Sequence, residues 1–213
     1  NIETLPTDGD DFGRLSQIQP DMDNNTGIAN WFQDACVGQG QRKFVIAPSD
    51  PNKIYFSTSG NLGDCPPAGS RSGLFRSRLD GNGVIHPLGG PSTRFEECPM
   101  PEAFNTTPLE ITGLEVSNVD EDRIFISFSG YEPDLKVYAS SDRGETWTNW
   151  DPNNALPNLP INDLVLQSGT DEGIYVAMDI GVYYRTRTTD WQPYFADLPN
   201  VQVRDLDINY CAG

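Results

Sequence analysis

Histidine and basic residues are scarce in this chain, and each shortage argues against a class of function. The 213 residues include one histidine, His86, and 14 lysines and arginines against 31 acidic residues, so the net charge is −17 at pH 7. Such a charge disfavours binding to nucleic acid or to an anionic membrane surface. No apolar run is long enough to span a bilayer, so we expect no membrane insertion. The chain starts at Asn1 without a signal peptide, as expected of a mature or excised segment.

Long helices are not expected either. The chain has 20 glycines and 17 prolines, which place turns along its whole length. Between these turns lie short apolar runs of the length and composition of β-strands. The central runs are Leu114–Val116, Ile124–Phe128 and Val137–Ala139. The sequence therefore predicts an all-β protein.

The same order of runs occurs on both sides of the central group. The upstream runs are Phe44–Ile46, Ile54–Phe56 and Leu74–Ser77, followed by a turn at Asp80–Gly83. The downstream runs are Leu164–Leu166, Ile174–Val176 and Val182–Tyr184, followed by Trp191. A fourth unit opens at Val203–Ile208, and the longer spacing between the first two units indicates an insertion in the first. Repeats of about 40 to 50 residues with about four strands each are typical of β-propeller blades.

The stretch between Ser140 and Trp147 has the pattern of a tight hairpin turn. Asp142 can accept hydrogen bonds from the turn amides, Gly144 can take a positive φ, and Trp147 can anchor the next strand. The segment resembles the Asp-box of β-propeller repeats in sialidases, sortilin-type receptors, xyloglucanases and many secreted bacterial proteins. Its signature positions all match, namely Ser140, Asp142, Gly144, Thr146 and Trp147. The resemblance implies a structural role for Asp142 in a peripheral turn, away from the central ligand face.

The third unit narrows the resemblance. Residues 156–163 and 173–185 are similar to the last repeats of large secreted Bacteroidetes proteins exported by the type IX system, and Leu198–Val201 repeats the phrase that links the blades. The similarity covers about residues 40 to 213. It implies an extracellular or cell-surface module with a binding or structural role, whose partners are further blades of the same protein or another extracellular subunit.

The predicted fold is a β-propeller segment of about three four-stranded blades plus the start of a fourth. Residues 1–40 are expected to form a loop-rich segment and residues 41–213 the propeller repeats. The expected blades cover residues 41–100, 108–155 and 160–200, with a partial blade at 201–213.

The cysteines lack the spacing of metal ligands. Cys36, Cys65, Cys98 and Cys211 include no Cys-X-X-Cys pair, which together with the single histidine argues against a zinc site. Two structural disulfides in an oxidising compartment are the better interpretation, and four cysteines permit three pairings. We expect Cys65 to pair with Cys98, because the two flank one blade, and Cys36 to pair with Cys211.

Calcium is the one cofactor that the sequence suggests. The candidate ligands lie in two aspartate-rich segments near the N-terminus, at Asp8 and Asp10 and at Asp21 and Asp23. Neither segment completes a loop, and Phe32 occupies the position where an EF-hand needs its last acidic ligand. The alternative is an acidic surface that is simply well solvated.

No catalytic constellation stands out. A glycosidase needs two carboxylates about 5 to 10 Å apart. With 31 acidic residues, some pair lies at this distance in any fold, so the number of carboxylates does not indicate an active site. The alternative function, a glycoside hydrolase of the sialidase or xyloglucanase propeller type, would require such a pair at the centre of the propeller. Four aromatic residues are candidates for stacking on sugar rings: Tyr175, Tyr183, Tyr184 and Trp191. Since Tyr183 and Tyr184 point to opposite faces of a strand, we expect most of this group to pack between blades.

Overall fold

The computed structural model describes residues 41–58, 73–84, 95–106, 109–194 and 199–210, and these form three four-stranded sheets. Each sheet is antiparallel, with its strands side by side in chain order. Blade 1 contains β1 (Gln41–Ile46), β2 (Ile54–Thr58), β3 (Gly73–Ser77) and β4 (Phe95–Glu97). Blade 2 contains β5 (Ile111–Val116), β6 (Ile124–Phe128), β7 (Val137–Ser140) and β8 (Thr148–Asn149). Blade 3 contains β9 (Ile161–Gln167), β10 (Gly173–Met178), β11 (Gly181–Arg185) and β12 (Gln192–Pro193).

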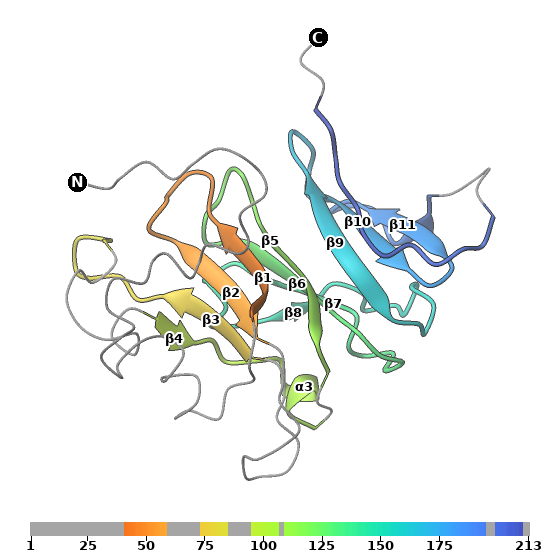
Figure 1. Ribbon diagram of the computed structural model, residues 1–213, viewed down its shortest axis with the longest axis horizontal. Helices are drawn as coiled ribbons and strands as arrows, with labels where there is room; N and C mark the ends of the chain where they lie inside the picture. Colours follow the sequence, from red (N-terminus) through yellow and green to blue (C-terminus); the bar gives the residue numbers. More distant parts are fainter. Residues whose placement is uncertain (1–40, 59–72, 85–94, 107–108, 195–198, 211–213) are drawn as a thin grey trace.

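The three sheets follow one another like the blades of a propeller (Figure 1). The first strand of each blade contacts the first strand of the next, β1 against β5 and β5 against β9. Lys43 of β1 also reaches Asp163 of β9, so the first strands of all three blades converge. The last strands β4, β8 and β12 lie at the opposite edges of their sheets. The chain is thus an all-β, partial β-propeller, as predicted, and each of the nine apolar runs lies in a strand.

The blades repeat one another residue by residue at their first two strands. In each blade, an apolar residue at or next to the end of the first strand pairs with an isoleucine eight positions later: Ile46 with Ile54, Val116 with Ile124 and Leu166 with Ile174. The turn between them is held by a polar side chain that accepts a backbone amide hydrogen bond, such as Asp50 from Asn52 and Asp120 from Asp122, each at 3.0 Å. This common register identifies equivalent positions in the three blades.

The hydrophobic core lies between the blades. The cluster between blades 1 and 2 includes Tyr55, Leu74, Leu114, Ile124 and Ile126, all buried. The cluster between blades 2 and 3 includes Phe125, Val137, Leu164, Ile174 and Val176, all buried. Because alternate residues of a strand point to opposite faces, the second strand of blade 2 supplies both clusters.

Gly113 allows β5 and β9 to approach closely. A Cβ atom at this position would lie 2.5 Å from Leu164 Cβ and 2.5 Å from Ser127 Oγ. Real Cβ contacts are much longer, so a side chain at Gly113 would push the two strands apart.

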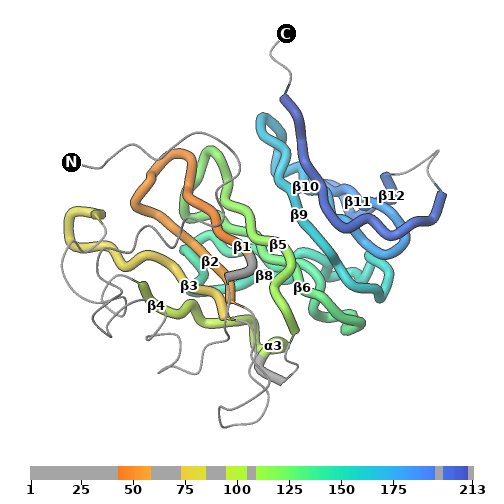
Figure 2. The backbone as a smooth tube through the Cα atoms, in the orientation of Figure 1, coloured from red at the N-terminus to blue at the C-terminus, as the bar shows by residue number. Residues whose placement is uncertain are grey.

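Two parts of the chain lie outside the sheets. The short helix α3 (Glu102–Thr106) joins blade 1 to blade 2, and its Phe104 packs against Phe128 with ring centroids 5.1 Å apart. Residues 199–210 contain no strand, so the expected start of a fourth blade at Val203–Ile208 is an extended segment without a strand partner in the described residues. The segment runs beside blade 3 (Figure 2). No helix in the described part of the chain has both the length and the apolar character to cross a membrane.

Candidate functional site

The turn from Ser140 to Trp147 is held together by its own side chains. Asp142 accepts hydrogen bonds from the Thr146 amide at 2.8 Å and from the Thr146 hydroxyl at 2.5 Å. Ser140 donates to Asp142 at 2.7 Å, and its oxygen accepts from the Gly144 amide at 2.8 Å. Gly144 has φ at +86°, a conformation that glycine tolerates best. Burial alone would raise the pKa of Asp142, but the hydrogen bonds from Thr146 and Ser140 outweigh it and lower the pKa.

A simpler version of this turn follows β3 in blade 1. The Asp80 carboxylate accepts hydrogen bonds from the amides of Asn82 at 2.8 Å and Val84 at 3.0 Å. Both aspartates accept an amide four positions later, so the two turns use the same local geometry.

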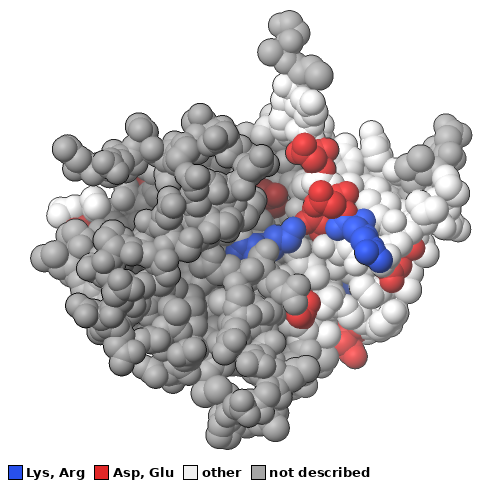
Figure 3. Space-filling model, in the orientation of Figure 1, with Lys and Arg blue, Asp and Glu red and all other residues white. Residues whose placement is uncertain are grey.

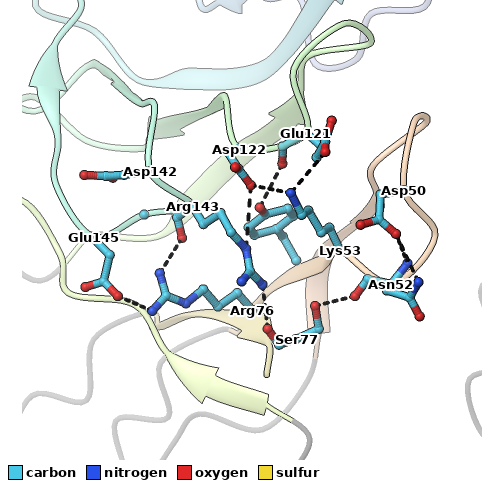
Figure 4. Close-up of polar contacts among 12 residues, drawn as sticks. Asp50, Asn52, Lys53, Arg76, Ser77, Glu121, Asp122, Asp142, Arg143 and Glu145 are labelled. Atoms are coloured by element: carbon cyan, nitrogen blue, oxygen red, sulfur yellow. Dashed lines mark hydrogen bonds and ion pairs between the residues drawn. The ribbon is translucent and has the colours of Figure 1, made fainter. Parts of the chain in front are cut away.

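The side chains of the 140–147 turn reach across to blade 1 (Figure 4). Arg143 donates to the Ser77 carbonyl at 2.7 Å, and Glu145 pairs with Arg76. Arg76 in turn donates to the Arg143 carbonyl at 3.0 Å. Trp147 donates its indole N–H to the Pro99 carbonyl at 2.7 Å. The turn therefore joins two blades as well as two strands.

Ion pairs also join the turns after the first strands (Figure 4). Lys53 of blade 1 contacts Asp122 at 2.7 Å and Glu121 at 3.1 Å in blade 2. Burial would lower the pKa of Lys53, but hydrogen bonds to Asp122 and Glu121 outweigh it and raise the pKa. Arg123 of blade 2 pairs with both carboxylate oxygens of Glu172 in blade 3, at 2.7 and 2.9 Å.

Aromatic rings support Arg123 in this second interface. Its guanidinium lies 4.7 Å from the ring centroid of Phe125 and 4.8 Å from that of Trp150. Arg187 adds a contact to Glu172 at 2.9 Å. A pocket of about 400 Å³ opens beside these groups, but its two arginines are already paired with carboxylates, so it offers no free positive charge to a ligand.

A charged cluster sits where the first strands converge. We call Lys43, Glu115 and Asp163 the axial cluster. The Lys43 ammonium lies 2.5 Å from Asp163, whose other carboxylate oxygen accepts the Leu206 amide at 3.0 Å. Burial raises the pKa of Glu115 to about 7, the charge of Asp163 adds to this, and Lys43 offsets part of it.

The sequence interpretation missed the axial cluster. Its three residues belong to no motif, and they lie up to 120 positions apart. One signal was available for two of the three residues: β1, β5 and β9 align through the common turn, so Lys43 and Asp163 occupy equivalent positions and had to lie near one another once the blades formed a propeller. Glu115 lies two positions after their equivalent, Gly113.

The third blade exposes an aromatic patch. Tyr175 lies 4.5 Å from Tyr184 and 5.0 Å from Tyr194 between ring centroids, and we call these three residues the tyrosine patch. A pocket of about 400 Å³ is lined by Tyr175, Tyr194, Val165, Val182 and residues 206–209. The proposed sugar platform is not assembled, because Tyr183 and Trp191 are buried in the cluster between blades 2 and 3. The expectation that most of these aromatics pack between blades thus holds for Tyr183 and Trp191 only.

The remaining predicted sites are only partly within the described residues. Cys98 is buried, and burial raises the pKa of its thiol to about 12. Its expected partner Cys65 lies outside the described residues, as do Cys36 and Cys211, so the disulfides stay a prediction. The calcium candidates Asp8, Asp10, Asp21 and Asp23 also lie outside them. Among the residues that are described, no three His, Cys, Asp or Glu side chains form a group able to hold a metal.

Comparison with known proteins gives structural neighbours but no family. No protein-family model and no curated protein matches the chain. It is similar to the GH74 xyloglucanase from Xanthomonas campestris, with 17% identity and a TM-score of 0.49 over 77% of this chain and 25% of that one. A GH74 enzyme from Niastella koreensis has 14% identity and a TM-score of 0.49, over 73% of this chain and 22% of that one. The extracellular domain of a hybrid two component system from B. thetaiotaomicron has 18% identity and a TM-score of 0.46, over 76% of this chain and 17% of that one.

The chain spans a quarter or less of the length of these proteins. At these scores the likeness carries no argument about function. The assignment of a partial propeller rests instead on the three sheets and their converging first strands.

Proposed function

We propose that this chain is an extracellular or cell-surface β-propeller module with a binding or structural role in a larger secreted protein. One observation carries the binding role: within the residues that the structure describes, blade 3 leaves partly uncovered a sheet face that is buried in the other two blades. Tyr55, Phe125 and Tyr175 occupy the same position in β2, β6 and β10. Tyr55 and Phe125 are fully buried, whereas Tyr175 is partly exposed and borders a pocket.

The charged groups support a structural module. The two blade interfaces carry ion pairs at equivalent turns, which fix one blade against the next. On the face in Figure 3, basic side chains of the described residues lie next to acidic ones. Paired groups of this kind stabilise the contacts between blades.

The extracellular setting rests on the sequence resemblance. The 140–147 turn has the residues of an Asp-box, and the third blade resembles cargo of type IX secretion. In this setting, the partners of the chain are further blades of the same protein or another extracellular subunit. Fractionation of the source cells with an antibody against residues 41–210 tests the setting, and a signal confined to the cytoplasm would contradict it.

A second candidate function is favoured by the axial cluster. Burial and the charge of Asp163 raise the pKa of Glu115 to about 7, so this side chain can hold a proton near neutral pH, as the general acid of a glycoside hydrolase must. However, Asp163 is engaged by Lys43 and by the Leu206 amide, and neither pocket described above is lined by Glu115.

Hydrolysis and binding are separated by one set of assays. Soluble polysaccharides, xyloglucan and sialylated glycans among them, are incubated with the chain and with Glu115→Gln. The binding module predicts no release of reducing ends by either protein. Release by the parent that is lost in Glu115→Gln would favour the hydrolase.

A further inference from the structure

The segment 203–208 repeats the pattern of the first strands. Residues 205–208 read Asp-Leu-Asp-Ile, and residues 163–166 of β9 read Asp-Leu-Val-Leu. Val203 then aligns with Ile161, the first residue of β9, so apolar residues stand at the same three positions. The segment therefore has the composition of a first strand although it lies in no sheet.

The segment also lies against β9 in the register that β9 adopts against β5. The Cβ position of Gly113 in β5 is 3.0 Å from the Leu164 amide nitrogen in β9. Asp163, equivalent to Gly113, accepts the amide of Leu206 at 3.0 Å, and Leu206 is equivalent to Leu164. Two more hydrogen bonds fix this placement, from Asn162 to the Val203 carbonyl at 2.8 Å and from the Val203 amide to the Met178 carbonyl at 3.0 Å.

One edge of the segment is open in the described structure. In an extended chain, backbone groups of alternate residues point to opposite edges. Leu206 directs its amide to Asp163, so Asp205 and Asp207 direct theirs the other way, and both residues are exposed. Within the described part of the chain, these two amides make no hydrogen bond. The tyrosine patch and the pocket of about 400 Å³ adjoin this segment.

We propose that residues 203–208 are the innermost strand of a fourth blade, and that the occupant of the open edge is an antiparallel, apolar β-strand of the kind seen in β6 and β10. The strand pairs along Asp205 and Asp207, and the blade to which it belongs covers the tyrosine patch. Contacts within the same molecule support this fit. β6 pairs with β5 and β10 pairs with β9, and Tyr55 and Phe125 are each covered by the blade that follows their own. The inference rests on the propeller module of the proposed function and names its binding surface.

The test uses the whole chain and a peptide with the sequence of residues 172–180, flanked by lysines for solubility. In β10 this sequence pairs with β9, with Val176 opposite Leu164 and Tyr175 opposite Val165. We expect saturable binding of the labelled peptide in fluorescence polarisation. A control peptide with proline in place of Ala177, which would lie opposite Asp205, should bind at least tenfold more weakly, because proline removes an amide that faces the open edge.

Variants of the chain locate the binding edge. Asp207→Pro removes one of the open amides and should weaken peptide binding at least tenfold, whereas Asp207→Ala removes the same carboxylate, keeps the amide and should bind as the parent does. Circular dichroism melts check that both variants are folded. Tyr184→Ala should weaken binding by a smaller factor, since it removes part of the patch only.

Three outcomes would overturn the inference: no binding of the peptide, equal binding by Asp207→Pro and Asp207→Ala, or concentration-dependent dimerisation of the chain that Asp207→Pro abolishes, because the occupant would then be a second copy. None of these bears on the cellular location. Conversely, a cytoplasmic location would refute the extracellular role and leave strand pairing intact.

Discussion

The two closed interfaces and the open face of blade 3 are built on equivalent positions but differ in what fills them. At the aromatic position, Tyr55 and Phe125 are buried by the following blade, whereas Tyr175 contacts only other tyrosines of its own blade among the rings described. At the end of the first turn, Lys53 and Arg123 each pair with an acidic residue of the following blade. Gly173 takes this place in blade 3 and has no charge to offer.

The difference shows that a blade interface has two separable parts. Burial of an aromatic ring stabilises without regard to direction, and the ion pair fixes which turn meets which. Blade 3 retains the aromatic part and lacks the ionic part. A partner at its open face is therefore selected by apolar contact and backbone pairing, while the two inner interfaces also depend on charge.

The largest expected effect is the loss of a buried ring at this aromatic position, compared with the loss of the partly exposed ring in blade 3. Phe125→Ala should lower the free energy of unfolding by about 3 to 5 kcal/mol, since a fully buried ring is lost from between two blades. Tyr175→Ala, at the equivalent partly exposed site, should cost about 1 kcal/mol. Urea unfolding followed by tryptophan fluorescence measures both. Equal costs would mean that the face of blade 3 is already covered.

The ion pairs give the next effect. Arg123→Met leaves Glu172, whose side chain is 9% exposed, with only the exposed Arg187 as partner, and should cost about 2 to 3 kcal/mol. Lys53→Met should cost about 1 kcal/mol or less, because Glu121 and Asp122 are 34% and 40% exposed and can be solvated instead. The same urea titrations apply. A larger loss of unfolding free energy for Lys53→Met than for Arg123→Met would show that solvent screening does not explain the difference between the two ion pairs.

The sequence predicted the strands well, because their signals are local. Apolar runs and the turns between them lie within about ten residues of one another, and Ile54, Ile124 and Ile174 begin the second strands or stand one residue inside them. The short outer strands β4, β8 and β12 carry no such pattern, and only Trp147 and Trp191, one residue before β8 and β12, indicated two of them.

The axial cluster and the fate of 203–208 depend on more distant contacts. Lys43 and Asp163 contact each other only because the three first strands converge. No local sequence pattern predicts this convergence. The segment 203–208 has the right residues for a strand, but a strand also needs a hydrogen-bonded neighbour, and the described residues supply none. Composition therefore indicated where the segment lies, while its pairing into a strand depends on a neighbour that the described residues do not contain.

The 140–147 turn should contribute less than the ion pair between Arg123 and Glu172. Asp142→Ala leaves the amide and hydroxyl of Thr146 and the hydroxyl of Ser140 without their acceptor, and should cost about 1 to 2 kcal/mol. Asp80→Ala, in the simpler and exposed turn of blade 1, should cost a few tenths of a kcal/mol at most, about the size of ordinary surface changes. Thermal melts of both variants compare them. An unchanged melting temperature for Asp142→Ala would show that this turn adds nothing to the closed interface.

A pH-dependent effect is expected at Glu115, which stands where Val45 and Val165 stand in the other blades. Burial and the charge of Asp163 raise its pKa from 4.5 to about 7 in the folded chain. The folded state therefore binds the proton more tightly than the unfolded state, so the stabilisation is complete below about pH 4.5 and is lost as the pH rises through 7. Glu115→Gln mimics the neutral form at every pH. The parent should match this variant at pH 4.5 and be less stable by about 1 kcal/mol at pH 8, a figure reduced for the partial exposure of the side chain. Paired melts across this range measure the difference, and a gap that stays constant or narrows with rising pH would show that the charge of Glu115 is not destabilising where the first strands converge.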